Sequence, residues 1–351
     1  MQGTFWRGKK VFLTGHTGFK GSWLALLLLQ QGADIYGYAL QPLQPNDLFH
    51  VVQLSNVMNS QFGDIRNYET LKRAITDYQP DIIFHLAAQP LVRASYNNPV
   101  ETFSTNVMGT VHLLEAARHV DSLKAIINVT SDKCYENSRN VQKSFVESDA
   151  MGGHDPYSAS KGCAELVSTA YTRSFYGAND KYIASARAGN VIGGGDWSRD
   201  RIIPDFVRSI MNQEAINIRQ PKAVRPWQHV LDCIHGYMLL AEKLWSEQDT
   251  FTGAWNFGPS AQDFRTVEQL IESSRSYMPR TVDVQYSTTG GPYEATYLVL
   301  NSQKAHDQLG WIPKLAFSEA VEWTMEWYES YLSGMNMSAV TNDQIRNYNT
   351  L

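Results

Sequence analysis

The chain of 351 residues is long enough for one large α/β domain or for two lobes. Apolar residues make up 43% of it and charged residues 19%, which supplies a buried core and excludes extended disorder. The net charge of −5 disfavours a protein that coats nucleic acid, because such proteins carry an excess of cations. It still allows a local basic pocket for one diphosphate.

No segment of the sequence is typical of a membrane anchor or of an exported protein. The apolar run at 23–29 is far shorter than the roughly 18 residues needed to cross a bilayer. Cys134, Cys163 and Cys233 are too few and too scattered for a disulfide framework or a zinc site. We therefore expect a soluble, cytoplasmic protein with reduced thiols and no bound metal.

Short apolar runs alternate with helix-period segments up to about residue 186. Strands are predicted at 10–14, 34–40, 57–62, 81–87, 125–130 and 182–187, and helices at 19–31, 67–78, 99–118 and 156–176. This alternation predicts an α/β fold with a doubly wound parallel sheet of the Rossmann type and helices on both faces. Residues 1–186 are therefore predicted to form a dinucleotide-binding domain.

Glycine and proline interrupt the pattern beyond residue 187. Helices are predicted near 201–212, 228–245, 265–276 and 317–332. We expect 187–333 to form mainly a smaller, mixed α/β lobe for substrate, with 228–257 returning to the first domain. The last segment, 334–351, is polar and without periodicity, and is predicted to be a loose tail.

A glycine-rich turn lies between the first predicted strand and the first predicted helix. It reads T-G-H-T-G-F-K-G and holds Gly15, Gly18 and Gly21. Glycine permits a tight turn and a close approach of the backbone to pyrophosphate, which the helix N-terminus then binds. We expect this turn to bind the cofactor through Gly15, His16, Thr17, Gly18, Phe19 and Gly21, with the His16 side chain facing solvent.

The choice between NAD and NADP stays open in the sequence. Dinucleotide-binding domains usually carry an acidic residue about 20 residues after the turn, at the end of the second strand. Here that region reads Y-A-L-Q-P, with neither an acid nor an arginine. Asp64, after the third strand, either accepts from the adenine amino group or is a solvated loop carboxylate.

Tyr157 and Lys161 lie four residues apart on a predicted helix, and so on one face of it. A phenol becomes a usable base when an ammonium group and a cofactor ribose stabilise its phenolate. A second pair at the same spacing, Tyr68 and Lys72, follows the third strand and is interpreted as a surface pair.

Three polar residues, Ser131, Asp132 and Lys133, end the apolar strand at 125–130. Open α/β sheets bind ligands at this carboxyl edge. A hydroxyl can hydrogen-bond a reacting sugar oxygen, and a buried carboxyl can donate a proton to a leaving hydroxyl. The alternative is an ordinary ion pair of Asp132 with Lys133 in an exposed turn.

In this order the motifs resemble the extended short-chain dehydrogenase/reductase family and, within it, the nucleotide-sugar 4,6-dehydratases. The resemblance extends to about residue 333. It rests on T-G-H-T-G-F-K-G (14–21), H-L-A-A-Q (85–89), N-V-M-G-T (106–110), T-S-D-K (130–133), Y-S-A-S-K (157–161), G-N-V-I-G-G-G-D-W (189–197) and R-P-W-Q-H-V-L-D (225–232). The segments S-D-K-C-Y, G-G-G-D-W and D-R-I-I-P-D are similar to the CDP-glucose branch.

The resemblance implies a redox-neutral loss of water from CDP-glucose with a tightly held NAD. The product would be a 4-keto-6-deoxy sugar on the route to deoxysugars of bacterial surface polysaccharide such as lipopolysaccharide O-antigen. Tyr157 would take the proton of the 4-hydroxyl, Lys161 would bind the ribose and lower the Tyr157 pKa, and Ser131 would steady the 4-oxygen. Asp132 would protonate the departing 6-hydroxyl.

One residue departs from the family pattern. Better-known 4,6-dehydratases carry a glutamate as the base at carbon 5, where this chain has Lys133. A lysine is a competent base only if its pKa lies well below about 10.4.

The resemblance also implies binding residues and an assembly. Further cofactor contacts would be Ile65, Leu86, Ala87, Ala88, Asn106 and Thr130, and substrate contacts Gln89, Asn190, Arg201, Arg225 and Glu294. The two arginines are candidate diphosphate clamps, because guanidinium matches phosphate oxygens, or else surface charges. Relatives form homodimers, sometimes paired into homotetramers, through helices of the first domain.

Three other functions are weighed against dehydration of CDP-glucose. A sugar 4-epimerase needs the glycine turn, Tyr157 and Lys161, but no acid and base beside Ser131. A dehydratase of another nucleotide hexose stays open, because no residue of the sequence selects cytosine over thymine on physical grounds. A non-catalytic NAD-binding module has no need of the tyrosine and lysine.

Overall fold

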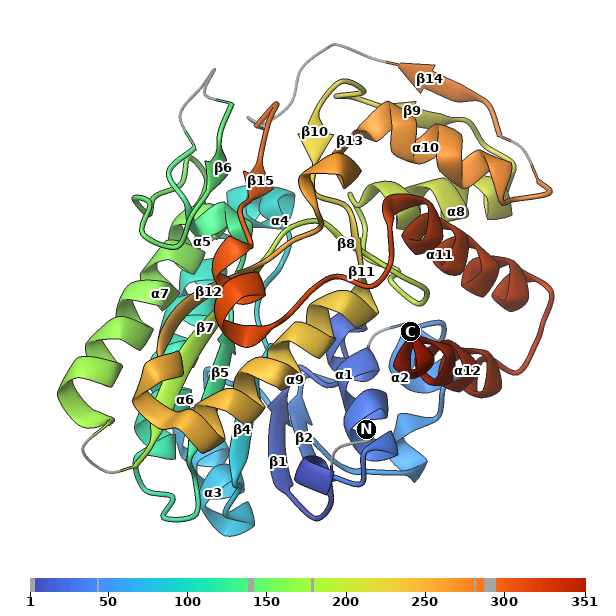
Figure 1. Ribbon diagram of the computed structural model, residues 1–351. Helices are drawn as coiled ribbons and strands as arrows, with labels where there is room; N and C mark the ends of the chain where they lie inside the picture. Colours follow the sequence, from blue (N-terminus) through green and yellow to red (C-terminus); the bar gives the residue numbers. More distant parts are fainter. Residues whose placement is uncertain (1–3, 43, 138–141, 178–179, 281, 287–294) are drawn as a thin grey trace.

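A parallel sheet of seven strands, in the order β12-β7-β5-β4-β1-β2-β3, is the centre of the molecule (Figure 1). This computed structural model describes residues 4–42, 44–137, 142–177, 180–280, 282–286 and 295–351. The strands are β1 Lys10–Thr14, β2 Asp34–Ala39, β3 Asn59–Phe62, β4 Ile82–His85, β5 Ala125–Val129, β7 Tyr182–Ala188 and β12 Gly253–Phe257. The predicted doubly wound Rossmann sheet is confirmed.

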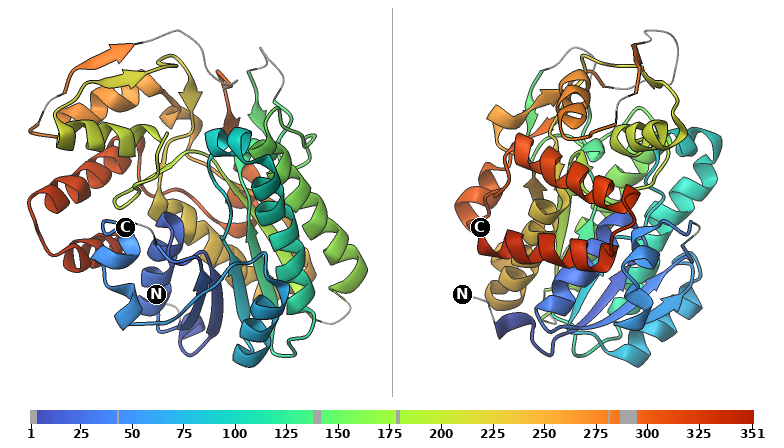
Figure 2. Two further views of the ribbon diagram at one scale, coloured as in Figure 1. Left: turned by 180° about the vertical axis from the view of Figure 1, so that it is seen from behind. Right: turned by 90° about the vertical axis from the view of Figure 1, so that its right-hand side faces the viewer.

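Helices cover both faces of the sheet, as Figure 2 shows from two sides. Helices α1 (Phe19–Gln30) and α9 (Val230–Glu247) pack on one face, and α3 (Tyr68–Tyr78), α6 (Gly109–Ala117) and α7 (Pro156–Phe175) on the other. The strands are apolar on both sides for this reason. Val11 and Leu13 point into the core beneath α1, whereas Phe12 between them points into the core beneath α3.

The predicted helix at 99–118 contains a change of pitch. It runs as α5 (Pro99–Phe103), a π-helical turn (Ser104–Met108) and α6.

Among the described residues, no helix combines the length and the apolar character that crossing a membrane requires.

Part of the chain beyond β7 lies outside the central sheet as a second lobe, at the upper right of Figure 1. Its helices are α8 (Ile202–Asn212), α10 (Val267–Ser276) and α11 (Phe317–Leu332). Short strands pair in twos: β9 (Ile216–Ile218) with β14 (Val284–Tyr286), β10 (Val224–Arg225) with β13 (Arg265–Thr266), β8 (Val191–Ile192) with β11 (Gln228–His229), and β6 (Ser144–Phe145) with β15 (Val299–Leu300). The short helices α2 (Leu48–Val51) and α4 (Val92–Asn97) belong to loops of the first domain. Between the short strands, α9 and β12 return to the central sheet.

The prediction of a loose C-terminal tail is wrong, because residues 337–350 form the packed helix α12 (Met337–Thr350). Met337, Thr341, Ile345 and Tyr348 repeat at helical spacing and are buried. Polar members hide this stripe in the sequence, but each has a partner: the Trp327 indole donates to Thr341 Oγ1 over 2.9 Å.

The hydroxyl of Tyr348 fastens the C-terminal helix to the first turn of α9. It donates over 2.8 Å to Oδ1 of Asp232, whose carboxylate also accepts from the backbone N–H groups of Lys314 and Leu315. Burial raises the pKa of Asp232 to about 6, against the lowering by these hydrogen bonds. The helix is therefore an integral part of the core.

Adjacent residues of α12 provide a test of this packing. Tyr348→Ala removes a fully buried ring and is expected to lower the free energy of unfolding by about 3 kcal/mol or more. Asn349→Ala, on the exposed face of the same turn, is expected to change it by less than about 0.5 kcal/mol. Urea denaturation measures both. Equal free energies of unfolding for the two variants would instead support the prediction of a loose C-terminal tail.

Candidate active site

A cavity of about 700 Å³ lies between the second lobe and the loops that follow β1, β4 and β5. Its wall contains most of the residues that the sequence predicted for cofactor, substrate or catalysis. These are Gly15, Thr17, Gly18, Phe19, Gly21, Asp64, Ile65, Leu86, Ala87, Ala88, Gln89, Thr130, Ser131, Asp132, Lys133, Tyr157, Lys161, Asn190, Arg201 and Arg225. His16 and Asn106 are absent from the wall, and Glu294 lies outside the described residues. Within the described chain, no group of acidic, histidine and cysteine side chains is arranged to hold a metal ion.

The glycine turn is packed too tightly for side chains at two of its three glycines. Gly15 has φ +78°, and a Cβ there would lie 2.7 Å from the backbone nitrogen of Ala87. A Cβ at Gly21 would lie 2.1 Å from the carbonyl oxygen of Gly15. At Gly18 the nearest atom of the chain is 3.5 Å away. Gly18 is also the N-cap of α1 and provides no side-chain cap, so the first N–H groups of the helix are open to an anion.

The expectation that His16 faces solvent is wrong, because its side chain is completely buried. Its Nε2 lies 2.6 Å from the hydroxyl of Ser60, and its ring meets Phe49 edge-on at 5.4 Å. Gly37 on β2 leaves room for the imidazole, since a Cβ there would lie 2.5 Å from it. Burial lowers the pKa of His16 to about 4, so the ring is neutral. It packs the glycine turn against Gly37 of β2 and hydrogen-bonds to Ser60 of β3.

Residues that follow β2 and β3 line one edge of the cavity, where an adenosine ribose would be expected. Thr17 donates to the carbonyl oxygen of Leu40 over 3.0 Å, and both residues line the cavity. Asp64 lines it too, but its two oxygens accept from the Arg66 guanidinium. These hydrogen bonds lower the Asp64 pKa, so the carboxylate is ionised and paired. Its role toward adenine stays a prediction.

Asn106 lies behind the wall rather than in it. Its Oδ1 accepts from the Gln89 backbone N–H over 2.8 Å, and its Nδ2 donates to the Gln89 carbonyl oxygen and to Ser160 Oγ. It therefore holds the loop after β4 against α7 and shapes the site without facing the cavity.

Helix α7 presents Tyr157 and Lys161 to the cavity. The helix begins where the Asp155 side chain accepts from the backbone N–H of Ser158, with Pro156 in the first turn. Burial raises the Tyr157 pKa to about 12, while a hydrogen bond with Ser131 and the charge of Arg201 lower it. Burial also lowers the Lys161 pKa to about 8, and its Nζ donates to the carbonyl oxygen of Val129 over 3.3 Å.

Ser131, Asp132 and Lys133 form a tight turn at the carboxyl end of β5. Ser131 caps a 3-10 turn (Asp132–Cys134), and its hydroxyl donates to Asp132 Oδ1 over 2.9 Å. Lys133 Nζ lies 3.6 Å from the same carboxylate, but the Asp132 side chain is 1% exposed and that of Lys133 30%. Asp132 Oδ2 is buried and has no hydrogen-bond partner among the described residues. This pair is not a solvated surface pair.

The second lobe contributes candidate anion-binding groups to the same cavity. Arg201 pairs with Asp196 at 2.8 Å, and Arg225 donates to the carbonyl oxygens of Val224 and Ala295. Both arginines line the cavity. Asn190 lines it too, and its Oδ1 is buried with no partner within the described part of the chain.

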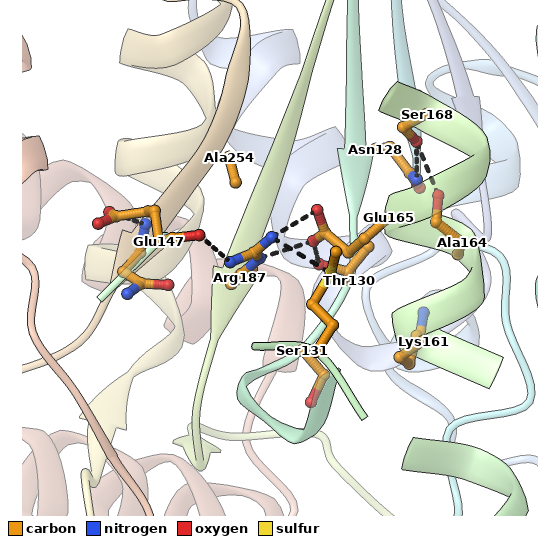
Figure 3. A network of polar contacts seen from close by, with 12 residues as sticks. Asn128, Thr130, Ser131, Glu147, Lys161, Ala164, Glu165, Ser168, Arg187 and Ala254 are labelled. Atoms are coloured by element: carbon orange, nitrogen blue, oxygen red, sulfur yellow. Dashed lines mark hydrogen bonds and ion pairs between the residues drawn. The ribbon is translucent and has the colours of Figure 1, made fainter. Parts of the chain in front are cut away.

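Sequence reasoning missed several residues that bear on the site. Lys20, Arg66, Arg93 and Arg219 also line the cavity. Glu165 on α7 and Arg187 on β7 form a buried ion pair beneath it (Figure 3). An arginine inside the otherwise uncharged run Y-I-A-S-A-R-A was the available signal, because a buried charge requires a partner.

The comparisons with known proteins decide the family. The sequence profile described as "GDP-mannose 4,6 dehydratase" matches residues 12–324. This chain belongs to that family. The predicted resemblance to nucleotide-sugar 4,6-dehydratases is thereby confirmed.

Individual relatives agree with the family assignment. The chain is 47% identical over 349 residues to a CDP-glucose 4,6-dehydratase of Salmonella typhimurium, with 98% of this chain and 97% of that protein covered. It is 28% identical to a UDP-glucose 4-epimerase of Halalkalibacterium halodurans, covering 92% of this chain and 97% of that protein. A structure of dTDP-glucose 4,6-dehydratase from Bacillus anthracis in complex with NAD matches with TM-score 0.77 and 22% identity, over 94% of this chain and all of that one, which shows a shared fold.

The glycine turn allows packing to be separated from ligand binding. Gly21→Ala forces a Cβ against the Gly15 carbonyl, and we expect a melting temperature several degrees lower, about 2–4 °C for each kcal/mol lost. Gly18→Ala meets no atom of the chain within 3.4 Å, so its melting temperature is expected to stay near that of the parent. Dinucleotide binding by Gly18→Ala should be weaker, because the new methyl group stands where the helix N-terminus meets the phosphates. Calorimetry measures both the melting temperature and the binding affinity. If Gly18→Ala binds the dinucleotide as tightly as the parent, the phosphates do not lie at this turn.

Proposed function

We propose that this chain is a CDP-glucose 4,6-dehydratase, a hydro-lyase that converts CDP-glucose to CDP-4-keto-6-deoxyglucose without net oxidation. The observation that carries the proposal is the 47% identity to the Salmonella enzyme over 98% of the chain. The arrangement of Ser131, Asp132 and Tyr157 at one cavity supports it, because an epimerase has no need of an acid beside that serine. We further propose a role in forming deoxysugars of bacterial surface polysaccharide.

NAD is the proposed cofactor, and the residues present fit it. The open position at Gly18 and the uncapped start of α1 suit a pyrophosphate, and the cavity continues from there to Tyr157 and Lys161. No arginine follows Leu40 at the end of β2, where a 2′-phosphate would need one, although Arg66 lies on the neighbouring loop. Bound NAD would take two electrons from carbon 4 of the hexose and return them to carbon 6.

Tyr157 is proposed to accept the proton of the sugar 4-hydroxyl. Its phenol and the Ser131 hydroxyl line the same cavity and interact, so a 4-oxygen that contacts both would meet the proton acceptor and a second hydroxyl that steadies it. Because burial opposes the phenolate, nearby cations have to stabilise it, and Arg201 already acts in this sense. Lys161, one turn further along α7, is proposed to bind the ribose hydroxyls.

Asp132 and Lys133 are proposed to remove water from carbons 5 and 6. Asp132 would protonate the departing 6-hydroxyl through Oδ2, the oxygen that lacks a partner among the described residues. Lys133 would take the proton from carbon 5, which the 4-ketone has made acidic. As carbon 6 is reduced, Lys133 would return a proton to carbon 5, and the proton that Tyr157 took from the 4-hydroxyl would restore Asp132 by way of solvent.

The nucleotide diphosphate is proposed to lie on the second-lobe side of the cavity. Asn190, Arg201 and Arg225 all line the cavity, and two guanidinium groups match phosphate oxygens. The proposed division is therefore residues 1–186 with 228–257 for the cofactor and mainly 187–333 for the nucleotide sugar. Gln89, after β4, is proposed to contact the hexose.

We also propose a homodimer or homotetramer in the cytoplasm. Helices α5 and α7 and the π-helical turn Ser104–Met108 pack together and carry exposed apolar side chains, with Val100 81%, Met108 46% and Leu166 58% exposed. A second copy of this face would cover them. All three cysteines are free thiols, which suits a reducing compartment.

The decisive experiment offers CDP-, dTDP-, UDP- and GDP-glucose to the purified protein without added reductant. We expect a 4-keto-6-deoxy product, detected by its ultraviolet absorbance in alkali, from CDP-glucose first. Tyr157→Phe, which keeps the ring and removes the proton acceptor, should lower kcat by about 100-fold or more. A product epimerised at carbon 4, with no water lost, would establish the epimerase instead.

Lys133 has a separate isotopic test. With Lys133→Ala in deuterated water, we expect the incorporation of deuterium at carbon 5 to slow by about 100-fold, because the proposed base is missing. Lys143→Ala, an exposed lysine paired with Asp149, is the matched control and should exchange at the parental rate. If Lys133→Ala exchanged as fast as the parent, another group would be the base.

A further inference from the structure

A carboxylate and a guanidinium are buried together directly beneath the catalytic turn. Arg187 Nε and Nη2 each lie 2.9 Å from an oxygen of Glu165, and both side chains are 3% exposed. Figure 3 shows the pair between β7 and α7, with Thr130 and Ser131 beside it. Glu165 follows Lys161 by one helical turn.

The ion pair contacts both ends of the turn that carries Ser131 and Asp132. Thr130, the residue before Ser131, donates its hydroxyl hydrogen to Glu165 Oε1. Tyr135, which follows the turn, accepts at its hydroxyl oxygen from Arg187 Nη1 over 2.7 Å. Four residues lie between these two anchors. The position of the turn relative to α7 is therefore fixed through Glu165 and Arg187.

The anchors are themselves held in place from the far side. The Tyr135 hydroxyl donates to Asn256 Oδ1 over 2.7 Å, and Asn256 Nδ2 donates to the carbonyl oxygen of Phe145 over 2.9 Å. Arg187 Nη1 also donates to the carbonyl oxygen of Glu147. The network thus joins β12 and the loop around β6 to the turn, and it leaves Arg187 well supplied with acceptors.

Stability alone is a weak reason for such a pair. Removing two charges from water costs about as much as their attraction returns, and apolar side chains of similar size often serve stability equally well or better. What an apolar pair lacks is direction: it has no hydrogen bonds with which to hold Thr130 and Tyr135. Geometry is therefore the property that the ion pair supplies and a hydrophobic substitute does not.

Glu165 also bears on the charge of Lys161. Burial and the charge of Lys20 lower the Lys161 pKa, whereas the carboxylate of Glu165 and the thiol of Cys134 raise it. His85 on β4 also faces the ammonium, and burial keeps that ring neutral. The same carboxylate that holds the turn thus favours the charged form of the lysine.

We propose that Glu165 and Arg187 are positioning residues for the dehydration, holding Ser131 and Asp132 on one side and Lys161 on the other in register with Tyr157. This inference rests on the proposed function. Neither side chain lines the cavity, so both act through their neighbours rather than on substrate.

The central variant is Glu165→Met with Arg187→Met, which removes both charges and leaves no unpaired ion. We expect it to fold with a melting temperature near or above that of the parent. Its kcat should fall by about 100-fold with KM changed less than about threefold, because misplacement affects the reacting geometry more than binding. Parental kcat in this folded variant would overturn the proposal.

A matched control comes from the same helix. Ser168 accepts from Asn128 Nδ2 over 2.8 Å, so it also joins β5 to α7, but away from the turn (Figure 3). Ser168→Ala is expected to lower the melting temperature and to leave kcat unchanged. An equal loss of kcat in Ser168→Ala would make the effect a general loosening of the helix and overturn the proposal.

Two single variants decide the matter if the double variant fails to fold. Thr130→Val and Tyr135→Phe each remove one link between the ion pair and the turn, and each should lower kcat by about tenfold. Parental kcat in both would overturn the proposal.

Hydrogen exchange followed by mass spectrometry gives a readout that needs no substrate. The amides of residues 131–135 should exchange faster in the double variant than in the parent, and at the parental rate in Ser168→Ala. If exchange is faster in the double variant but the parent dehydrates no nucleotide hexose, the positioning role stands and the proposed function is removed. If the parent is active and the double variant keeps the parental exchange rate and kcat, the proposed function stands and the positioning role is overturned.

Discussion

A single β–α–β crossover carries nearly all of the proposed chemistry. Strands β5 and β7 are parallel neighbours, with Val129 opposite Ala186, and α7 passes over them between the two. Because parallel strands end at the same edge, the turn after β5 and the end of β7 meet the first turns of α7 there. Tyr157, Lys161 and Glu165 then follow at helical spacing along the face that the turn contacts.

The consequence of this arrangement is that the proposed catalytic groups are fixed by core packing. Tyr157 and Lys161 are both buried, and burial shifts their pKa values in opposite directions, to about 12 and about 8. Burial therefore disfavours both the Tyr157 phenolate and the Lys161 ammonium. The phenolate depends on hydrogen bonds and cations delivered at defined positions, which is why a small displacement of Ser131 or Arg201 matters.

Much of this was predictable from the sequence, and the reasons are local. Strand β1 was predicted over 10–14 and lies there, because K-V-F-L-T is bounded by the glycine turn and covered on both faces. The second tyrosine–lysine pair could be set aside by position: Lys72 stacks over the Tyr68 ring on α3, on the outside of the sheet. Gly15, Gly18 and Gly21 were recognisable because backbone close approach leaves glycine as the only solution at two of them.

The failures have one physical origin, which is that polar side chains were interpreted without their partners. His16 was predicted to face solvent because its partner is not local: its Nε2 hydrogen-bonds to Ser60, 44 positions later in the chain. The buried face of α12 contains polar residues, so the sequence pattern did not reveal it. Its hydroxyl groups are hydrogen-bonded to Trp327 and Asp232. Arg187 has its carboxylate 22 positions earlier, on a different element. Pairings at such separations depend on the sheet order, and the sequence pattern does not contain that order.

The same reasoning explains why the departure at Lys133 is compatible with dehydration. A glutamate at this position would place a second carboxylate beside the buried Asp132, and like charges at that distance would raise the pKa of one of them. Lys133 instead lies 3.6 Å from Asp132 and is of opposite charge type. Its side chain is 30% exposed, which gives a proton taken from carbon 5 a route of exchange with solvent. The chemistry requires one donor and one acceptor at adjacent carbons, and this turn supplies both without a second buried anion.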